Sequence, residues 1–231
     1  MADYPQQDGN RPIKPHRYEV FDAEGRSLDP PPRRSPGPKP WVSYGILALC
    51  VLTYILALVT WQSPRPLTFS PGLGLVFPGI ITHMFAHADL LHLLFNMIVL
   101  FFFGTVMERT YGHWRYVLLY FVAGIFAALA QAAVMPNGLL LGASGALAGV
   151  MAAFVRHYPH VRVYIWGILP MPAWLMILIW IGYNIIGAGS GEASVAFVAH
   201  LAGFAAGGAL SIMLMPPGRP GLKRPVWPDQ D

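Results

Sequence analysis

Long apolar stretches separated by short polar ones dominate the chain after about residue 40. Between Trp41 and Pro216 the only acidic residues are Asp89, Glu108 and Glu192. An apolar run of about 20 residues is long enough to cross a bilayer as a helix. The pattern predicts six helical segments, with ends good to about 2–4 residues, at 41–61, 90–107, 115–135, 139–155, 163–186 and 194–215.

The composition agrees with a membrane protein that crosses the bilayer several times. Of the 231 residues, 55% are hydrophobic and 11% are charged, whereas about 25% of a typical soluble domain is charged. Residues 1–40 are polar and rich in proline, which predicts a disordered cytoplasmic tail. They lack the basic start and apolar stretch of a cleavable signal peptide. We therefore expect an all-α, six-helix membrane domain over residues 41–215, followed by a second cytoplasmic tail at 216–231.

The basic residues predict how the helices are oriented. Those in the N-terminal tail are Arg11, Lys14, Arg17, Arg26, Arg33, Arg34 and Lys39. If this tail lies inside, the inner side also receives Arg109, Arg115, Arg156, Arg162, Arg219, Lys223 and Arg224. The outer side then receives only Arg65. Because cytoplasmic loops carry an excess of Lys and Arg, we expect both termini in the cytoplasm and an even number of spans. Since the tail resembles neither a secretory signal nor an acidic-poor mitochondrial transit peptide, we expect a bacterial inner membrane.

This topology brings four polar residues near one face of the membrane. Segments two, four and six all start on the outer side, and near their starts lie His92 with Asn96, Ser144 and His200. At about 1.5 Å of rise per residue, each should lie roughly 5–10 Å below the outer surface. His92 and Asn96 are four residues apart, so they share a helix face. The four side chains are therefore expected at one depth.

Small residues favour close contact between two of these helices. Gly145 and Gly149 form one small-x-x-x-small pair, and Gly203 and Gly207 form another. Such pairs let helix backbones approach closely in lipid. Taken alone, the small residues around Ser144 indicate packing more often than catalysis. The convergence of the polar groups at one depth favours a catalytic role over a packing role.

A serine hydroxyl becomes a good nucleophile when a base removes its proton. His200 is a suitable base for Ser144. No Asp or Glu lies at this depth on another segment, so we expect a Ser–His dyad rather than a Ser–His–Asp triad. The side-chain amide of Asn96, the ring N–H of His92 and the backbone N–H of Ser144 are suitable donors to the oxyanion that attack on a carbonyl creates.

Three short motifs resemble those of the rhomboid intramembrane serine proteases. They are "HLLFN" from His92 to Asn96, "GASG" around Ser144 and "AHLAGFAAG" around His200. The resemblance covers roughly residues 75–215. It implies an endopeptidase that cleaves transmembrane segments of membrane proteins near their outer end. Ser144 would be the nucleophile, His200 the base, and His92 and Asn96 part of the oxyanion hole. The implied partners are transmembrane substrates and the lipid bilayer, with no cofactor and no nucleic acid.

Further features of the resemblance are the Glu108-Arg109 pair, Gln131 and the loop histidines in "THMFAHADLLH". The sequence departs from the family at two places. Where many bacterial rhomboids carry Trp-Arg in the first outer loop, it reads "VFPGII". Where many have an aromatic residue one turn after the serine, it has Ala148. Another aromatic residue, such as Phe204 or Trp180, would then have to pack against the histidine.

Other functions stay open from the sequence alone. A catalytically inactive, rhomboid-like protein that binds membrane proteins is one alternative. A zinc site built from His83, His87 and His92 is another, but there is no HExxH motif, and we assign His83 and His87 to loop structure. A transporter would need polar groups through the full membrane depth, whereas here they cluster near one face. The three remaining membrane-domain histidines, on the opposite face, are expected to be interfacial: His113, His157 and His160.

Overall fold

The computed structural model describes residues 38–74, 76–165, 168–189 and 196–215. The predicted tails, 1–40 and 216–231, therefore lie outside the described residues, apart from 38–40. The main helices are α1 (Trp41–Leu56), α3 (Leu90–Val99), α4 (Thr105–Tyr111), α5 (His113–Val134), α6 (Ser144–His157), α7 (Ala173–Gly189) and α8 (Phe197–Met213). Short π-helical stretches extend α1 over Ala57–Trp61 and join α3 to α4 over Leu100–Gly104.

These helices confirm the predicted all-α membrane bundle. Within the described residues, three helices are long and apolar enough to cross a membrane: Trp41–Thr60, Leu90–Tyr111 and His113–Val134. The helices α7 and α8 are shorter and apolar, and α6 has 14 residues. The loop between α1 and α3 contains a short helix, α2 (Gly79–Thr82), and 3-10 turns at Arg65–Leu67, Pro71–Leu73 and His83–Phe85.

Two predicted helix starts were wrong. The fourth segment begins at Ser144 rather than at residue 139, so Ser144 is the first residue of α6. The fifth begins at Ala173, because a hairpin of strands β1 (Arg162–Ile165) and β2 (Leu169–Pro172) occupies the region where helix was expected from residue 163. Proline has no N–H to donate inside a helix, and β2 contains two prolines. The alternating residues of β1 also suit a strand.

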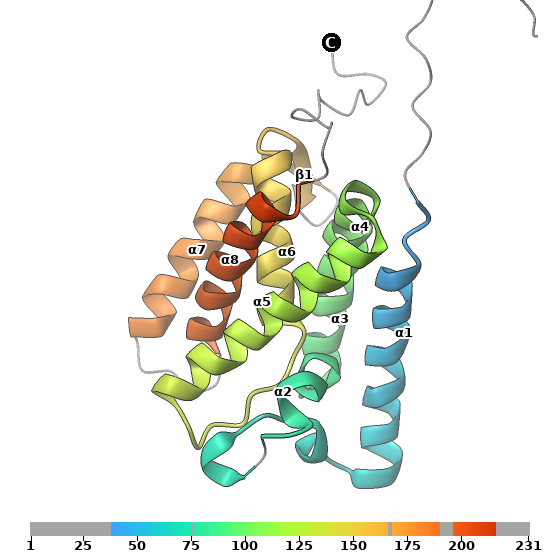
Figure 1. Ribbon diagram of the computed structural model, residues 1–231, viewed down its shortest axis with the longest axis vertical. Helices are drawn as coiled ribbons and strands as arrows, with labels where there is room; N and C mark the ends of the chain where they lie inside the picture. The colour runs from blue at the N-terminus through green and yellow to red at the C-terminus, as the bar shows by residue number, and fades with distance from the viewer. Residues whose placement is uncertain (1–37, 75, 166–167, 190–195, 216–231) are drawn as a thin grey trace, which may run out of the picture. The chain divides into compact units, whose positions relative to one another are not determined.

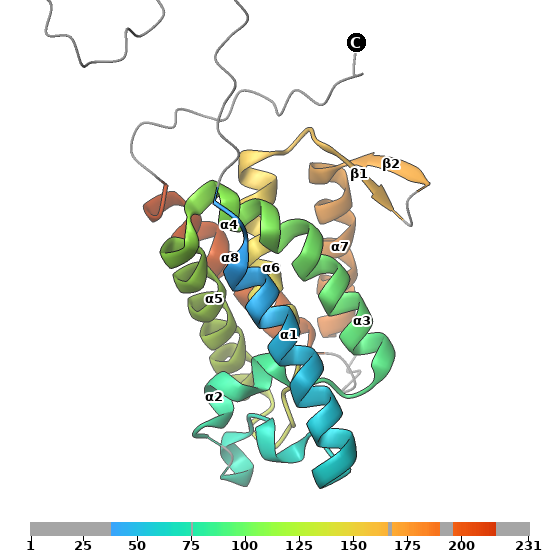
Figure 2. The ribbon, with the colours of Figure 1, turned by 90° about the vertical axis from the view of Figure 1, so that its right-hand side faces the viewer.

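The helix α6 lies in the middle of the bundle, with α5 and α8 as its main packing partners (Figure 1). Its residues from Gly145 to Phe154 are all buried. The start of α1, the end of α8 and the hairpin lie at one end of the bundle, and α2 lies at the opposite end (Figures 1 and 2). Successive long helices alternate in direction, and α3, α6 and α8 all begin at the end that holds α2.

Glycines bring α6 and α8 into backbone contact. A side chain added at Gly203 would collide with the carbonyl group of Gly145, and one added at Gly207 would collide with the backbone of Gly149. On its other side, a side chain at Gly149 would collide with Ala123 of α5. The predicted small-residue pairs therefore lie at the contact between α6 and α8. This contact holds the starts of the two helices, and the polar residues on them, close together.

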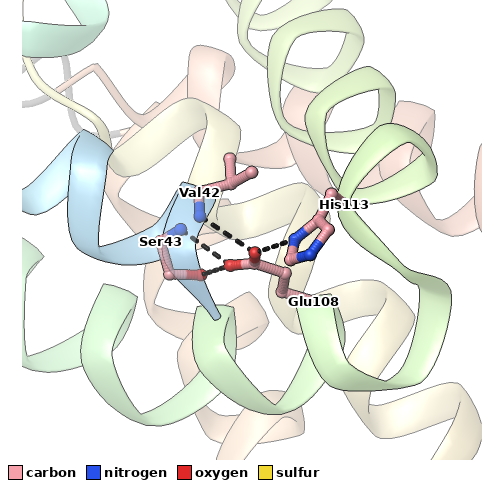
Figure 3. A network of polar contacts seen from close by, with 4 residues as sticks. All are labelled: Val42, Ser43, Glu108 and His113. Atoms are coloured by element: carbon pink, nitrogen blue, oxygen red, sulfur yellow. Dashed lines mark hydrogen bonds and ion pairs between the residues drawn. The ribbon is translucent and has the colours of Figure 1, made fainter. Parts of the chain in front are cut away.

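A buried carboxylate caps the start of α1 from a different helix (Figure 3). Glu108 of α4 is 0% exposed. Its Oε1 accepts the backbone N–H of Val42 at 2.9 Å, and its Oε2 accepts the N–H and the hydroxyl of Ser43, both at 2.7 Å. His113 was expected to be an ordinary interfacial residue. Its Nδ1 atom lies 2.6 Å from Oε1 of Glu108. The first N–H groups of a helix have no partner within it, and Pro40 before α1 provides no side-chain cap.

The loop between α1 and α3 buries two imidazoles. His83 is 2% exposed and His87 is 1% exposed. The Nδ1 atom of His83 lies 3.0 Å from the carbonyl oxygen of Gly79. Burial lowers the pKa of each imidazole from 6.5 to about 4, because the charged form is poorly solvated there.

We expect acidification to destabilise the protein through these two residues. Between pH 6.5 and 4 the unfolded chain binds protons that the folded chain does not. The contribution of the two neutral imidazoles to the free energy of unfolding is therefore complete above pH 6.5 and is lost as the pH falls toward 4. At pH 5 the loss should reach about 2 kcal/mol for each imidazole, at about 1.4 kcal/mol per pKa unit.

Thermal unfolding in detergent at pH 7.5 and pH 5 measures this effect. His87→Leu should shrink the difference in Tm between the two pH values. His160→Leu, at an exposed position, should leave the difference unchanged. A pH dependence that is the same in His87→Leu and in the wild type would contradict the assignment to His87.

Candidate active site

Ser144 and His200 meet across the contact between α6 and α8. Ser144 is the first residue of α6, and His200 lies in the first turn of α8. The distance between the Ser144 Oγ and the His200 Nε2 is 2.8 Å, a hydrogen bond between the two side chains. The two helices that carry these residues are those that the paired glycines bring together. The geometry required for a base to remove the serine proton is therefore present.

All four residues singled out in the sequence line one cavity of about 450 Å³. Its polar lining includes His92, Asn96, Gln131, Ser144 and His200. Its apolar lining includes Phe95, Val99, Leu147, Met151 and Trp180, from α3, α6 and α7. A polar cluster inside a largely apolar cavity between helices is suited to bind an extended segment of an apolar chain and hold one peptide bond beside the serine.

The start of α3 holds His92 and Asn96 in place. The side chain of Asp89 caps this helix, with its Oδ1 accepting the N–H of His92 at 2.8 Å. Asn96, which is 6% exposed, donates from Nδ2 to the carbonyl oxygen of His92 at 2.8 Å. An amide nitrogen carries two hydrogens, so one remains for another acceptor. The N–H of Ala88 lies 3.5 Å from the Nδ1 of His92, which favours the tautomer with its hydrogen on Nε2.

Gly142 shapes the loop that precedes the serine. Its φ is +115°, and a Cβ atom on it would lie 2.7 Å from the Nε2 of His92 and 3.7 Å from the Oγ of Ser144. The N–H of Gly142 donates to the carbonyl oxygen of His83 at 2.8 Å. Only glycine combines this backbone conformation with the available space. The role of Gly142 was not predicted from the sequence, because a positive φ does not show in the residue pattern.

We expect Gly142→Ala to displace His92. The methyl group needs the space that the imidazole occupies, and a left-handed φ costs alanine about 1–2 kcal/mol. If the chain is the endopeptidase that its motifs imply, cleavage of a transmembrane substrate should fall by about 100-fold, comparable to the loss of one oxyanion donor. A matched control is Gly182→Ala on α7, where an added Cβ meets nothing within 4 Å. Equal activity of the two variants would contradict this assignment.

The other ring nitrogen of His200 has a partner that the sequence analysis missed. The Nδ1 of His200 lies 2.7 Å from the Oδ1 of Asn184 on α7. The ring of Trp180 lies beside the imidazole, with ring centroids 5.7 Å apart and planes tilted by 36°. Of the two aromatic residues proposed to stand in for Ala148, Trp180 is therefore the one that contacts His200. Phe204 packs on Trp180 instead, at 6.1 Å between centroids.

Gln131 joins α5 to the start of α8. Its Oε1 accepts the N–H of Ala199 at 3.2 Å, one residue before His200. In the part of the chain that the structure describes, no group of three or more His, Cys, Asp or Glu side chains is arranged to hold a metal ion. The polar side chains that line the cavity comprise a hydroxyl, two imidazoles, two carboxamides and the carboxylate of Asp89.

Comparison with known proteins identifies the family. The model of the Rhomboid domain matches residues 76–217, a range that includes Ser144 and His200. The chain belongs to the rhomboid family. This rhomboid is 31% identical over 145 residues to RHOMBOID-like protein 12, mitochondrial, of Arabidopsis thaliana, covering 54% of this chain and 43% of that protein. It is 29% identical over 177 residues to Rhomboid protein 1, mitochondrial, of Saccharomyces cerevisiae, covering 69% and 49%.

A bacterial relative carries a protease name. The rhomboid is 31% identical over 125 residues to Rhomboid protease GluP of Bacillus subtilis, covering 51% of this chain and 24% of that protein. The chain spans less than half the length of each of these three relatives. The family and the apolar helices make the chain an integral membrane protein. Two of the three relatives are mitochondrial by name, so the bacterial inner membrane expected from the sequence is not supported.

Proposed function

We propose that this rhomboid is a serine endopeptidase that cleaves transmembrane segments of membrane proteins. The observation that carries the proposal is the 2.8 Å contact between the Ser144 Oγ and the His200 Nε2 within a cavity between helices. The protease name of the relative from Bacillus subtilis supports it. The cavity lies at the end of the bundle where α6 and α8 begin, which the basic residues predict to be the outer end. Both termini are then cytoplasmic, and the cut lies near the outer end of the substrate.

In the first half of the reaction, the Nε2 of His200 takes the proton from the Oγ of Ser144 as the oxygen attacks the substrate carbonyl carbon. A C–O bond forms, and the carbonyl electron pair moves onto oxygen to give an oxyanion. His200 then donates its proton to the amide nitrogen as the C–N bond breaks, and the amine leaves. In the second half, His200 takes a proton from water, the hydroxide oxygen attacks the acyl group, and the Ser144 oxygen leaves with a proton from His200.

Three donors are available for the oxyanion. As the first residue of α6, Ser144 has a backbone N–H without an acceptor within the helix, and the positive end of the helix dipole favours an anion there. Asn96 has its second amide hydrogen, and His92 has a hydrogen on Nε2 in the tautomer favoured by Ala88. Donors already held in place stabilise the charge that develops in the transition state.

Activity-based labelling tests the proposal. A fluorophosphonate probe reacts with a serine only when its hydroxyl is activated by a base. Mass spectrometry of the purified, labelled protein should find the probe on Ser144. Ser144→Ala and His200→Ala should remove the label, whereas Ser63→Ala, in the loop after α1, should keep it. Absence of labelling under conditions that label an active rhomboid would overturn the proposal and favour an inactive protein that binds membrane proteins.

A further inference from the structure

Asn184 is the only carboxamide in α7, a helix whose other residues are apolar, aromatic or glycine. Its side chain is 0% exposed. Burying an amide is unfavourable unless its donor and acceptor groups are paired. Both the oxygen and the nitrogen of the Asn184 amide have a hydrogen-bond partner. The Oδ1 atom lies 2.7 Å from the Nδ1 of His200, and Nδ2 donates to the backbone carbonyl oxygen of Trp180 at 2.7 Å. The amide therefore has a defined orientation.

This orientation selects the tautomer of His200. A backbone carbonyl can only accept, so the carbonyl of Trp180 requires the amide NH₂ on its side. The amide oxygen then faces His200, and Nδ1 must carry the hydrogen that is donated to it. In a neutral imidazole the other nitrogen is then without a hydrogen. The Nε2 atom, 2.8 Å from the Oγ of Ser144, is consequently the acceptor of the hydroxyl hydrogen.

We propose that Asn184 is a positioning residue for His200, so that the site operates as a Ser–His–Asn triad rather than as a two-residue dyad. The inference rests on the proposed protease function. Asn184 does not line the cavity, so it acts through His200 and not on the substrate. The ring of Trp180, one helical turn earlier on α7, holds the imidazole from its face. The helix α7 thus fixes both the ring plane and the tautomer of the base.

Two substitutions at this position separate orientation from packing. Asn184→Leu fills a similar volume but removes the acceptor for Nδ1, so either tautomer becomes available to His200. We expect kcat to fall by about 100-fold, within the usual contribution of a positioned base, with KM changed by less than about twofold. Asn184→Asp keeps an acceptor at the same place. It should retain kcat within about tenfold of the wild type.

The pH profile provides a signature that a purely structural role would not produce. A carboxylate at residue 184 stabilises the imidazolium, so the acid limb of kcat/KM in Asn184→Asp should move to higher pH by about one unit. Among the described residues, the titratable side chains that share the cavity with His200 are His92 and Asp89. Neither changes in these variants, so a shift is assigned to residue 184. Tyr183→Leu, an adjacent and exposed position on α7, is the matched control and should match the wild type.

The decisive experiment measures kcat, KM and the pH profile for cleavage of a model transmembrane substrate in liposomes, together with the rate of fluorophosphonate labelling of Ser144. Slow cleavage and slow labelling of Asn184→Leu, with the shifted profile of Asn184→Asp, would support the positioning role of Asn184. If the wild type cleaves and both variants keep its kcat and pH profile, the positioning role is wrong while the protease function stands. If Asn184→Leu does not fold, the profile of Asn184→Asp alone decides. A wild type that neither cleaves nor labels would overturn both proposals.

Discussion

Ser144→Ala is expected to reduce kcat for cleavage of a transmembrane substrate by about 10⁶-fold, which is the scale of loss when the nucleophile of a serine protease is removed. In the proposed mechanism the variant lacks the oxygen that forms the acyl intermediate, so the remaining groups can only polarise the carbonyl and orient water. Its fold should be unchanged, because the variant removes one hydroxyl at the first residue of α6, while the backbone contacts of Gly203 and Gly207 with α6 remain. Helicity and Tm in detergent check this.

The companion variants show whether the groups act as one unit. His200→Ala should lose about as much kcat as Ser144→Ala, and the double variant should lose little more, because residues acting in one step are not additive. Asn96→Ala should lose about 10²–10³-fold, the usual effect of removing one oxyanion donor. Cleavage assays on proteoliposomes with equal amounts of reconstituted protein measure all four. Cleavage by Ser144→Ala at the wild-type rate would rule out a serine mechanism.

The predicted meeting of Ser144 with His200 came from the period of the apolar segments, the charge of the loops and the paired glycines. Alternation of spans put His92, Ser144 and His200 at the starts of α3, α6 and α8, and the paired glycines predicted which helices touch. Those features depend on the bilayer, which permits few arrangements of apolar helices. The same reasoning could not find the hairpin at 162–172, since its short strands are apolar enough to read as the start of a span.

The partner of Asn184 could not be predicted from the residue pattern. A single amide in an apolar helix signals a buried polar contact, but the partner depends on the rotation of α7 about its axis. The signal was present, since Trp180 and Asn184 are four residues apart and therefore share a face. Which face meets His200 was not predictable, because α7 is apolar on all sides apart from Asn184 and its sequence does not fix its rotation. The partner of Glu108 was not predictable either, because its hydrogen bonds to the first turn of α1 join residues 65 positions apart in the sequence.

The second large effect is expected at Glu108, at the opposite end of the bundle from α2. Glu108→Leu should destabilise the membrane domain by about 3–5 kcal/mol, because it leaves the N–H groups of Val42 and Ser43 and the hydroxyl of Ser43 without their acceptor. For a protein of this size, that corresponds to a fall in Tm of roughly 10 °C. Thermal unfolding in one detergent, followed by circular dichroism, measures the change.

Milder substitutions in the same network should each lower the stability by only a part of the effect of Glu108→Leu. Glu108→Gln keeps one acceptor oxygen and should lose less than Glu108→Leu. Ser43→Ala removes one hydroxyl bond, worth about 1 kcal/mol, and leaves both backbone bonds to the carboxylate. His113→Ala, whose side chain is 45% exposed, should cost least, because the three hydrogen bonds from α1 to the carboxylate remain. If Glu108→Leu and Ser43→Ala lower Tm equally, the carboxylate does not cap α1, and the stability of this end must come from apolar packing alone.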